Sequence, residues 1–197
     1  MISDSIEKLK QRIIELSENE EFIHHSWFVK YHLKIVETIS LELCDVYKKS
    51  NRDLVSTMVW MHDYGKILDF DNQYETTQKE GMKVLLELGF EKEFATKVLG
   101  HIKIMDSKLT FDLNFAPLEV KIVSSADGAA HLVGPFFCVY FQENHSRTLE
   151  DLMVSNIRKA TKDWERKIVL PEVKKAFEDR HKCTLEQNGQ IPDKFFV

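Results

Sequence analysis

The chain has 197 residues, of which 43% are hydrophobic and 30% are charged, as is typical of a globular protein with one sizeable core. Its net charge of -5 and its lack of a basic stretch argue against a nucleic-acid backbone as the main partner. Three widely spaced cysteines and an N-terminus without a long apolar run predict a cytoplasmic protein with no membrane anchor. Only 7 glycines and 4 prolines interrupt the chain, which predicts mostly helix.

The first two predicted helices cover residues 4–18 and about 28–48. The second carries an apolar stripe at helical spacing, and His32 lies on that stripe between Phe28 and Val36. A single histidine on an apolar face is more often a packed core residue than a ligand. His32 therefore becomes a metal-ligand candidate only if other ligands converge on it.

The third helix is predicted to begin at Asn51 or Asp53 and to end in the sequence Trp-Met-His-Asp-Tyr-Gly-Lys, residues 60–66. His62 completes the buried face of this helix, and Asp63, about 100° further round, points to the flank of the same face. We expect Gly65 to end the helix in a left-handed conformation. Lys66 can then bind an anion beside the site, or be a solvated lysine favoured by the helix dipole.

Residues 69–77 are polar and predict a loop, after which Thr77 and Glu80 form a capping-box pattern for a helix that ends at Gly89. A short helix follows within residues 90–105. His101 lies near its buried face, where it can be a ligand, a proton donor, a substrate-binding group or a structural histidine.

Pro117 suits the first turn of an apolar central helix. Asp127 is the only charge in the run of small residues that ends this helix, from Ser124 to Ala130. A buried carboxylate is costly unless a metal or a cation accompanies it, which predicts a ligand at this position. His131, one turn later, is expected to orient Asp127 rather than to bind the metal itself.

The segment after Gly134 and Pro135 begins with a strongly apolar stretch, residues 136–141. We expect it to form a loop or the start of a helix that packs on the bundle, lines a pocket or makes the contact of a homodimer. Thr148 is expected to cap a helix through Glu165, and Pro171 to begin the last helix.

The order His32, then His62-Asp63, then Asp127 resembles the H…HD…D motif of the HD superfamily of metal-dependent phosphohydrolases. The resemblance covers about residues 22–134 and includes Tyr64-Gly65-Lys66, which is similar to the family's HD-x-G-K form. It implies an all-α HD-domain helical bundle with additional C-terminal helices. We expect one domain over residues 1–197, with its core at about 22–134 and a helical extension at about 135–197.

The resemblance implies one divalent ion per chain, held by His32, His62, Asp63 and Asp127. Such an ion activates water and polarises a phosphoryl oxygen, and the mixed ligands allow Mn, Fe, Co, Ni, Mg or Zn. Asp63 is expected to orient or deprotonate the water, while Lys66 and His101 neutralise developing charge. No histidine lies between His62 and His101, where a second metal would need one.

The predicted function is therefore hydrolysis of a phosphoester of a small molecule, with a nucleotide as the expected substrate. Two alternatives use the same scaffold. One is an HD-type lyase, hydratase or oxygenase that acts on a non-phosphate substrate. The other is a non-catalytic metal-binding module, which a closed ligand shell without an adjoining pocket would favour.

Overall fold

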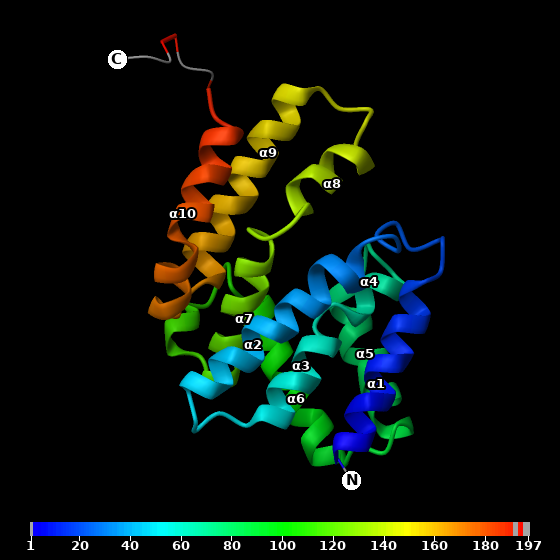
Figure 1. Cartoon of the computed structure of the whole chain (residues 1–197). Helices are drawn as coiled ribbons and strands as arrows, with labels where there is room; N and C mark the ends of the chain where they lie inside the picture. Colours follow the sequence, from blue (N-terminus) through cyan, green and yellow to red (C-terminus); the bar gives the residue numbers. More distant parts are fainter. Residues whose placement is uncertain (1, 191–192, 195–197) are drawn as a thin grey trace.

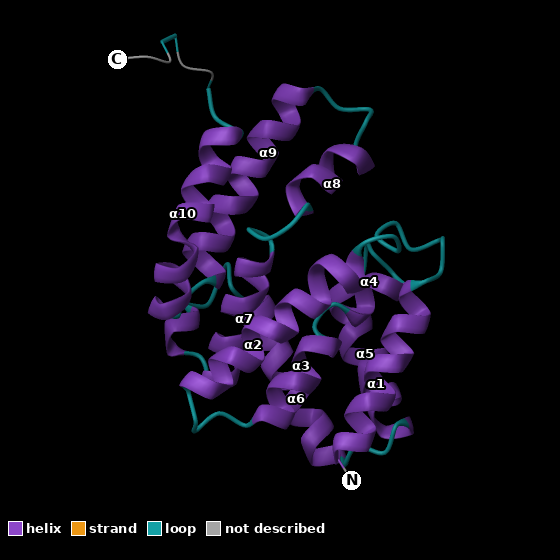
Figure 2. Cartoon of the chain, viewed as in Figure 1, coloured by secondary structure: helices purple, strands orange, loops and turns teal. Residues whose placement is uncertain are grey.

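The computed structural model describes residues 2–190, 193 and 194, and the remaining residues of the predicted 1–197 domain lie outside the described part. Over the described residues every regular element is a helix, which confirms the all-α class (Figure 2). Two short elements, η1 and η3, are π-helical turns, and η2 is a 3-10 turn. The elements are α1 (Ile2–Ser17), η1 (Val29–Leu33), α2 (Lys34–Val46), α3 (Arg52–Met61), α4 (Tyr64–Leu68), α5 (Gln73–Glu87), α6 (Lys92–Asp106), η2 (Leu113–Phe115), α7 (Leu118–Ala130), α8 (Phe136–Glu143), α9 (Leu149–Lys162), η3 (Asp163–Lys167) and α10 (Pro171–Gln187).

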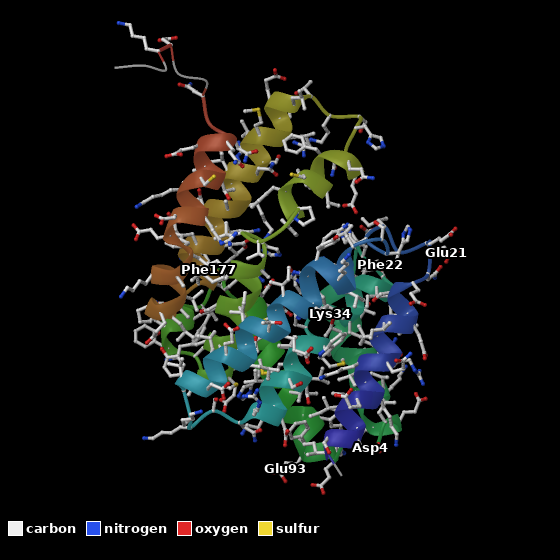
Figure 3. All side chains as sticks on the ribbon, in the orientation of Figure 1. Asp4, Glu21, Phe22, Lys34, Glu93 and Phe177 are labelled. Atoms are coloured by element: carbon white, nitrogen blue, oxygen red, sulfur yellow. The ribbon has the colours of Figure 1, made fainter. Side chains whose placement is uncertain are left out.

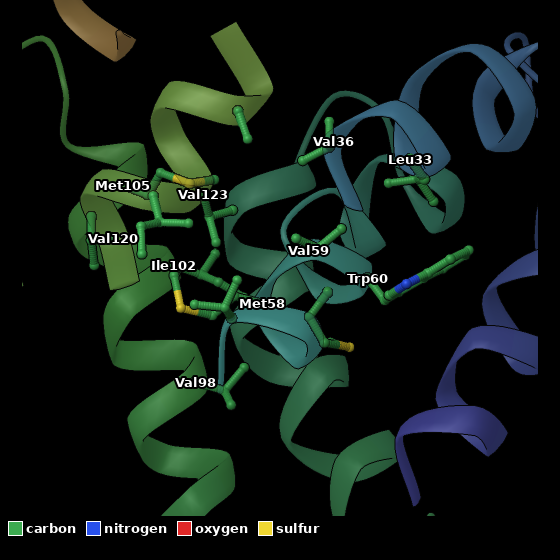
Figure 4. Close-up of a cluster of buried hydrophobic side chains, with 14 of the residues drawn as sticks. Leu33, Val36, Met58, Val59, Trp60, Val98, Ile102, Met105, Val120 and Val123 are labelled. Carbon is green, nitrogen blue, oxygen red and sulfur yellow. The ribbon is translucent and has the colours of Figure 1, made fainter. Parts of the chain in front are cut away.

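Helix α3 lies at the centre of the bundle, in contact with α1, α2, α6 and α7 (Figure 1). Every residue from Leu54 to Met61 is buried, because this short helix is surrounded on all sides. Each large apolar side chain buried here contributes roughly 1.5–3 kcal/mol to folding. Apolar side chains from several helices meet around α3, among them Val36, Met58, Val59, Ile102 and Val123 (Figure 4). His62 directly follows Met61, so its position is fixed by a tightly packed helix.

Helix α7 is the second buried helix, and the C-terminal part of the chain packs against it. A Cβ atom built on Gly128 would lie 2.8 Å from Cγ1 of Ile168 and 3.0 Å from Cβ of Lys167. The segment after α9 can approach α7 this closely because the α7 residue has no side chain. The Ser125 hydroxyl accepts hydrogen bonds from the backbone N–H groups of Val169 and Leu170, which fixes the segment in place.

Helices α9 and α10 lie side by side and extend away from the bundle, and α8 lies between them and the N-terminal helices (Figure 1). None of the residues of α8 is fully buried. Charged side chains such as those of Asp4, Lys34 and Glu93 are exposed on the outer faces of the helices (Figure 3). No helix of the described residues combines the length and the apolar character needed to cross a membrane.

Several predicted helix ends are confirmed by hydrogen bonds. The Asn51 side chain accepts from the N–H of Leu54 at the start of α3, and the Thr148 hydroxyl accepts from the N–H of Asp151 at the start of α9. Gly89 has a φ of +87°, as expected for a glycine that ends a helix.

The prediction of a left-handed Gly65 was wrong. Among the described residues only Gly89 and Gly134 have positive φ, and Gly65 lies inside α4. A Cβ on Gly65 would lie 2.0 Å from the carbonyl oxygen of Gln73, so this glycine allows two helices to approach. The same contact explains why the capping box at Thr77 was wrong. The Thr77 hydroxyl donates to the Gln73 carbonyl and accepts from the N–H of Gly65.

Two further segments contain more helix than the sequence alone specified. Residues 69–77 were expected to form a loop, but α5 begins at Gln73, four residues before the predicted cap. The apolar stretch 136–141, expected to be a loop or the start of a helix, forms most of α8, and Phe136 and Phe137 line the cavity described below.

Candidate metal centre

His62 presents an unpaired nitrogen to a carboxylate. Its Nδ1 lies 2.8 Å from the carbonyl oxygen of Val59, and a carbonyl can only accept, so Nδ1 carries the proton. In the neutral ring, Nε2 then carries the lone pair. This atom is buried without a hydrogen-bond partner and lies 3.5 Å from Oδ2 of Asp63. Two acceptor atoms facing each other in a buried place fit a site for a cation between them.

His32 approaches the same carboxylate from the other side. It lies in the π-helical turn η1 and is 2% exposed. Its Nε2 is 3.5 Å from Oδ2 of Asp63 and 3.8 Å from Oδ1 of Asp127. Single π-helical turns occur frequently at functional sites, because the extra residue shifts side chains around the helix. The apolar stripe that carries His32 therefore does converge with the His62-Asp63 pair.

The two carboxylates of the site are each neutralised by a lysine. Nζ of Lys66 is 2.6 Å from Oδ2 of Asp63, and Nζ of Lys167 is 2.5 Å from Oδ2 of Asp127. Burial alone would raise the pKa of both carboxyls, but the neighbouring ammonium groups hold each pKa well below its usual value. Both groups are therefore ionised, which is the form that binds metal.

The predicted ligands form two overlapping groups that could hold a metal ion. In one group the ligand atoms of His32, His62 and Asp63 all lie within 4.8 Å of one another, and in the other those of His32, Asp127 and His131 do so. Nitrogen and oxygen ligands of this kind suit several divalent ions and do not single out one. The structure thus brings together His32, His62, Asp63 and Asp127, and adds His131.

The Nδ1 side of the His131 ring contacts charged groups. Its Nδ1 lies 2.7 Å from Oδ2 of Asp163 and 2.8 Å from Nζ of Lys159, and its Nε2 lies 3.5 Å from Oδ1 of Asp127. Burial and the nearby Lys159 ammonium lower the pKa of His131 to about 3. The ring is therefore neutral at physiological pH.

A cavity of about 800 Å³ lies over these residues. Its size falls in the range of about 300–1,000 Å³ that is usual for small-molecule sites. Although the chain has a net charge of -5, the cavity is lined by more cationic than acidic side chains. The cations are Lys66, Lys108, Arg158, Lys159, Lys162 and Lys167, and the acids are Asp63, Asp106, Asp127 and Glu143.

Aromatic side chains form much of the remaining wall. Phe28, Phe70, Tyr74 and Tyr140 are among them. Trp27 also lines the cavity, and its indole N–H donates to Oε1 of Glu143 at 2.7 Å, which connects α8 to the segment before η1. A cavity of this composition suits a ligand with an anionic end and a flat or apolar body.

His101 is the one predicted site residue that the structure does not bring to the cavity. It lies on α6, one turn before Met105, which does line the cavity. Burial lowers the pKa of His101, while Glu119 opposes the shift, and neither effect comes from the ligand groups. The end of α6 and the loop that follows contribute Asp106 and Lys108 to the cavity instead.

Sequence reasoning missed the residues that the C-terminal helices contribute. Lys159, Asp163 and Lys167 lie in α9 and η3, and their side chains contact Asp127 or His131. The local signal was weak: Asp163 and Lys167 are four residues apart, next to the apolar run 168–170. No protein-family model, curated protein or solved structure matches the chain, so the resemblance to the HD superfamily rests on the sequence motif alone.

Proposed function

We propose that the chain is a metal-dependent phosphohydrolase that binds one divalent ion through His32, His62, Asp63 and Asp127. The observation that carries this proposal is the buried Nε2 of His62, which has no hydrogen-bond partner and faces the Asp63 carboxylate. The ion supplies a Lewis acid and lowers the pKa of a bound water. The adjoining cavity favours a catalytic site over a closed structural one, because catalytic sites keep an open position.

The charges around the ligands support a phosphorylated substrate. Lys66 lies at the cavity wall beside Asp63, where its ammonium can bind a phosphoryl oxygen and stabilise the charge that develops on it. Asp63 and Asp127 are ionised, so either can accept a hydrogen bond from the attacking water and orient it. His101 takes no part in this proposal, since it lies outside the cavity lining.

The lining also bears on the class of substrate. Cationic side chains suit the phosphate of a small molecule, and the aromatic wall suits stacking of a planar ring, as in the base of a nucleotide. We therefore propose a nucleotide or another small phosphorylated compound with a planar group. Mn, Fe, Co, Ni, Mg and Zn all suit the mixed ligand set.

The test is phosphate release from a panel of nucleotides and phosphoesters in the presence of Mn²⁺, Co²⁺ or Ni²⁺. Asp63→Asn should lower kcat/KM by about 100-fold or more, because a ligand that supports several kcal/mol of transition-state stabilisation is lost. The control is Glu80→Gln, which removes an acid that pairs with Lys83 away from the cavity. Turnover of no panel member with any of the metals, or full activity in Asp63→Asn, would contradict the proposal.

A further inference from the structure

We infer that His131 is an additional protein ligand of the proposed metal ion and that Asp163 is the residue that orients it. The inference rests on the proposed metal site and adds a ligand that the H…HD…D order does not contain. It also assigns a role to η3, far along the chain from the motif.

The hydrogen bonds of His131 place its lone pair toward the site. Asp163 is 1% exposed and contacts the ammonium groups of Lys159 and Lys167, so it is an ionised acceptor. Nδ1 of His131 lies 2.7 Å from Oδ2 of Asp163 and 2.8 Å from Nζ of Lys159, and in the tautomer that donates to Asp163 it carries the proton. Nε2 is then an acceptor, and it faces Oδ1 of Asp127 at 3.5 Å. This repeats the arrangement of His62 with Asp63.

The position of His131 also fits a shared ion. Its ring is parallel to that of His32, with 5° between the planes and 5.2 Å between the centroids. The ligand atoms of His32, Asp127 and His131 lie within 4.8 Å of one another. Two ligands bound at about 2.1 Å lie at most about 4.2 Å apart, so shifts of less than about 1 Å would let these three residues bind one ion. The group of His62 and Asp63 shares His32 with them.

Asp163 fits the role of an orienting carboxylate. Ligand histidines usually donate their second N–H to a carboxylate or carbonyl, which fixes the tautomer and the ring orientation. Lys167 lies 2.5 Å from Asp127 and 3.8 Å from Asp163, so one cation connects the ligand carboxylate to the orienting one. The alternative is the other neutral tautomer, in which Nδ1 accepts a hydrogen bond from Lys159 and the Nε2–H faces Asp127, so that the ring binds no metal. The two roles predict different results with a bound ion.

The experiment is a titration of the metal-free protein with Co²⁺, whose visible absorption reports the number and type of its ligands. His131→Ala should weaken Co²⁺ binding about 10- to 100-fold and change the spectrum, and added imidazole should restore it. Asp163→Asn should weaken binding by a similar factor, as is typical for the partner of a ligand histidine. The matched control is His181→Ala on α10, whose ring stacks on Trp164 outside the cavity.

A measurement on the wild-type protein with Co²⁺ bound counts the ligand histidines directly. With Co²⁺ bound, paramagnetically shifted imidazole signals are expected from three histidines, and the His131 signal should be perturbed in Asp163→Asn. Signals from His32 and His62 alone, with unchanged binding in His131→Ala, would overturn the inference and leave the proposed metal site standing. A wild-type protein that binds no Co²⁺ would overturn both.

Discussion

The two sides of the metal centre are held in place by different forces. On the side of η1, α3 and α7, the ligands are attached to buried helices whose apolar side chains and small residues fix their positions. On the side of α9 and η3, packing on Gly128 and hydrogen bonds to Ser125 hold the backbone, while the charged ends of Lys159, Asp163 and Lys167 are held mainly by one another and by the residues they contact. The first side is thus sensitive to packing and the second to the loss of a single charge.

The largest effect is expected on the second side. Lys167→Met keeps most of the side-chain volume but removes the cation between Asp127 and Asp163, both of which are buried. Removing one partner of a buried ion pair costs about 3–5 kcal/mol, and we expect that loss in the unfolding free energy of the metal-free protein. Urea unfolding measures it. Lys162→Met, at the exposed last position of α9 and directly before η3, is the control and should change stability by less than about 0.5 kcal/mol. Equal effects of the two substitutions would contradict the comparison.

A smaller effect is expected where the two sides pack against each other. Gly128→Ala places a Cβ 2.8 Å from Ile168 and should destabilise the protein by about 2 kcal/mol, because overpacking forces neighbouring atoms to shift. Gly100→Ala is the matched substitution, since it also lies within a helix but its Cβ meets nothing within 4 Å. It should stabilise the protein by up to about 1 kcal/mol through helix propensity. Thermal unfolding of the two variants should therefore shift in opposite directions, and a shift in the same direction would argue against tight packing at Gly128.

The smallest effect depends on pH and concerns Asp106 at the cavity wall. Burial raises the pKa of this carboxyl to about 6, and its side chain is 17% exposed. The pKa of this carboxyl is about 4 in the unfolded chain and is higher in the folded protein. Its contribution to stability is therefore complete below about pH 4 and is lost as the pH rises through 6, because the buried carboxyl must then ionise. Asp106→Asn should therefore match the wild type near pH 4 and be about 1–2 kcal/mol more stable at pH 7. Unfolding of the metal-free proteins across this range measures the difference, and a constant difference would contradict the assignment to Asp106.

The parts of the site that follow helical periodicity could be predicted from the sequence. His62 lies at the end of a continuous buried face, and His32 lies on an apolar stripe, so the 3.6-residue repeat placed both toward the core. Asp127 was predicted to be a ligand because a single buried charge among small residues needs a partner. His101 also lies near a buried face, but periodicity gives the direction of a side chain and not its height along the helix. His101 lies one helical turn away from the residues that line the cavity.

The C-terminal contributions could not be predicted, for two physical reasons. The ion pair of Lys167 with Asp127 joins residues 40 positions apart, and nothing in either local sequence specifies its partner. In addition, η3 is a π-helical turn, so its side chains depart from the α-helical register on which the expected helix to Glu165 was based.

The conformation of Gly65 could not be predicted either, since a glycine that ends a helix and one that permits close packing look alike in sequence.

The lysine partners of Asp63 and Asp127 have a consequence for the order of events in the cell. Small domains whose fold depends on a metal leave their ligands without compensation until the ion arrives, and they unfold when it is removed. Here the two ligand carboxylates already have counter-charges from Lys66 and Lys167, while Nδ1 of His32 and Nε2 of His62 are buried without hydrogen-bond partners. Burial of these carboxylates thus does not require an ion, and we expect the chain to fold before an ion binds.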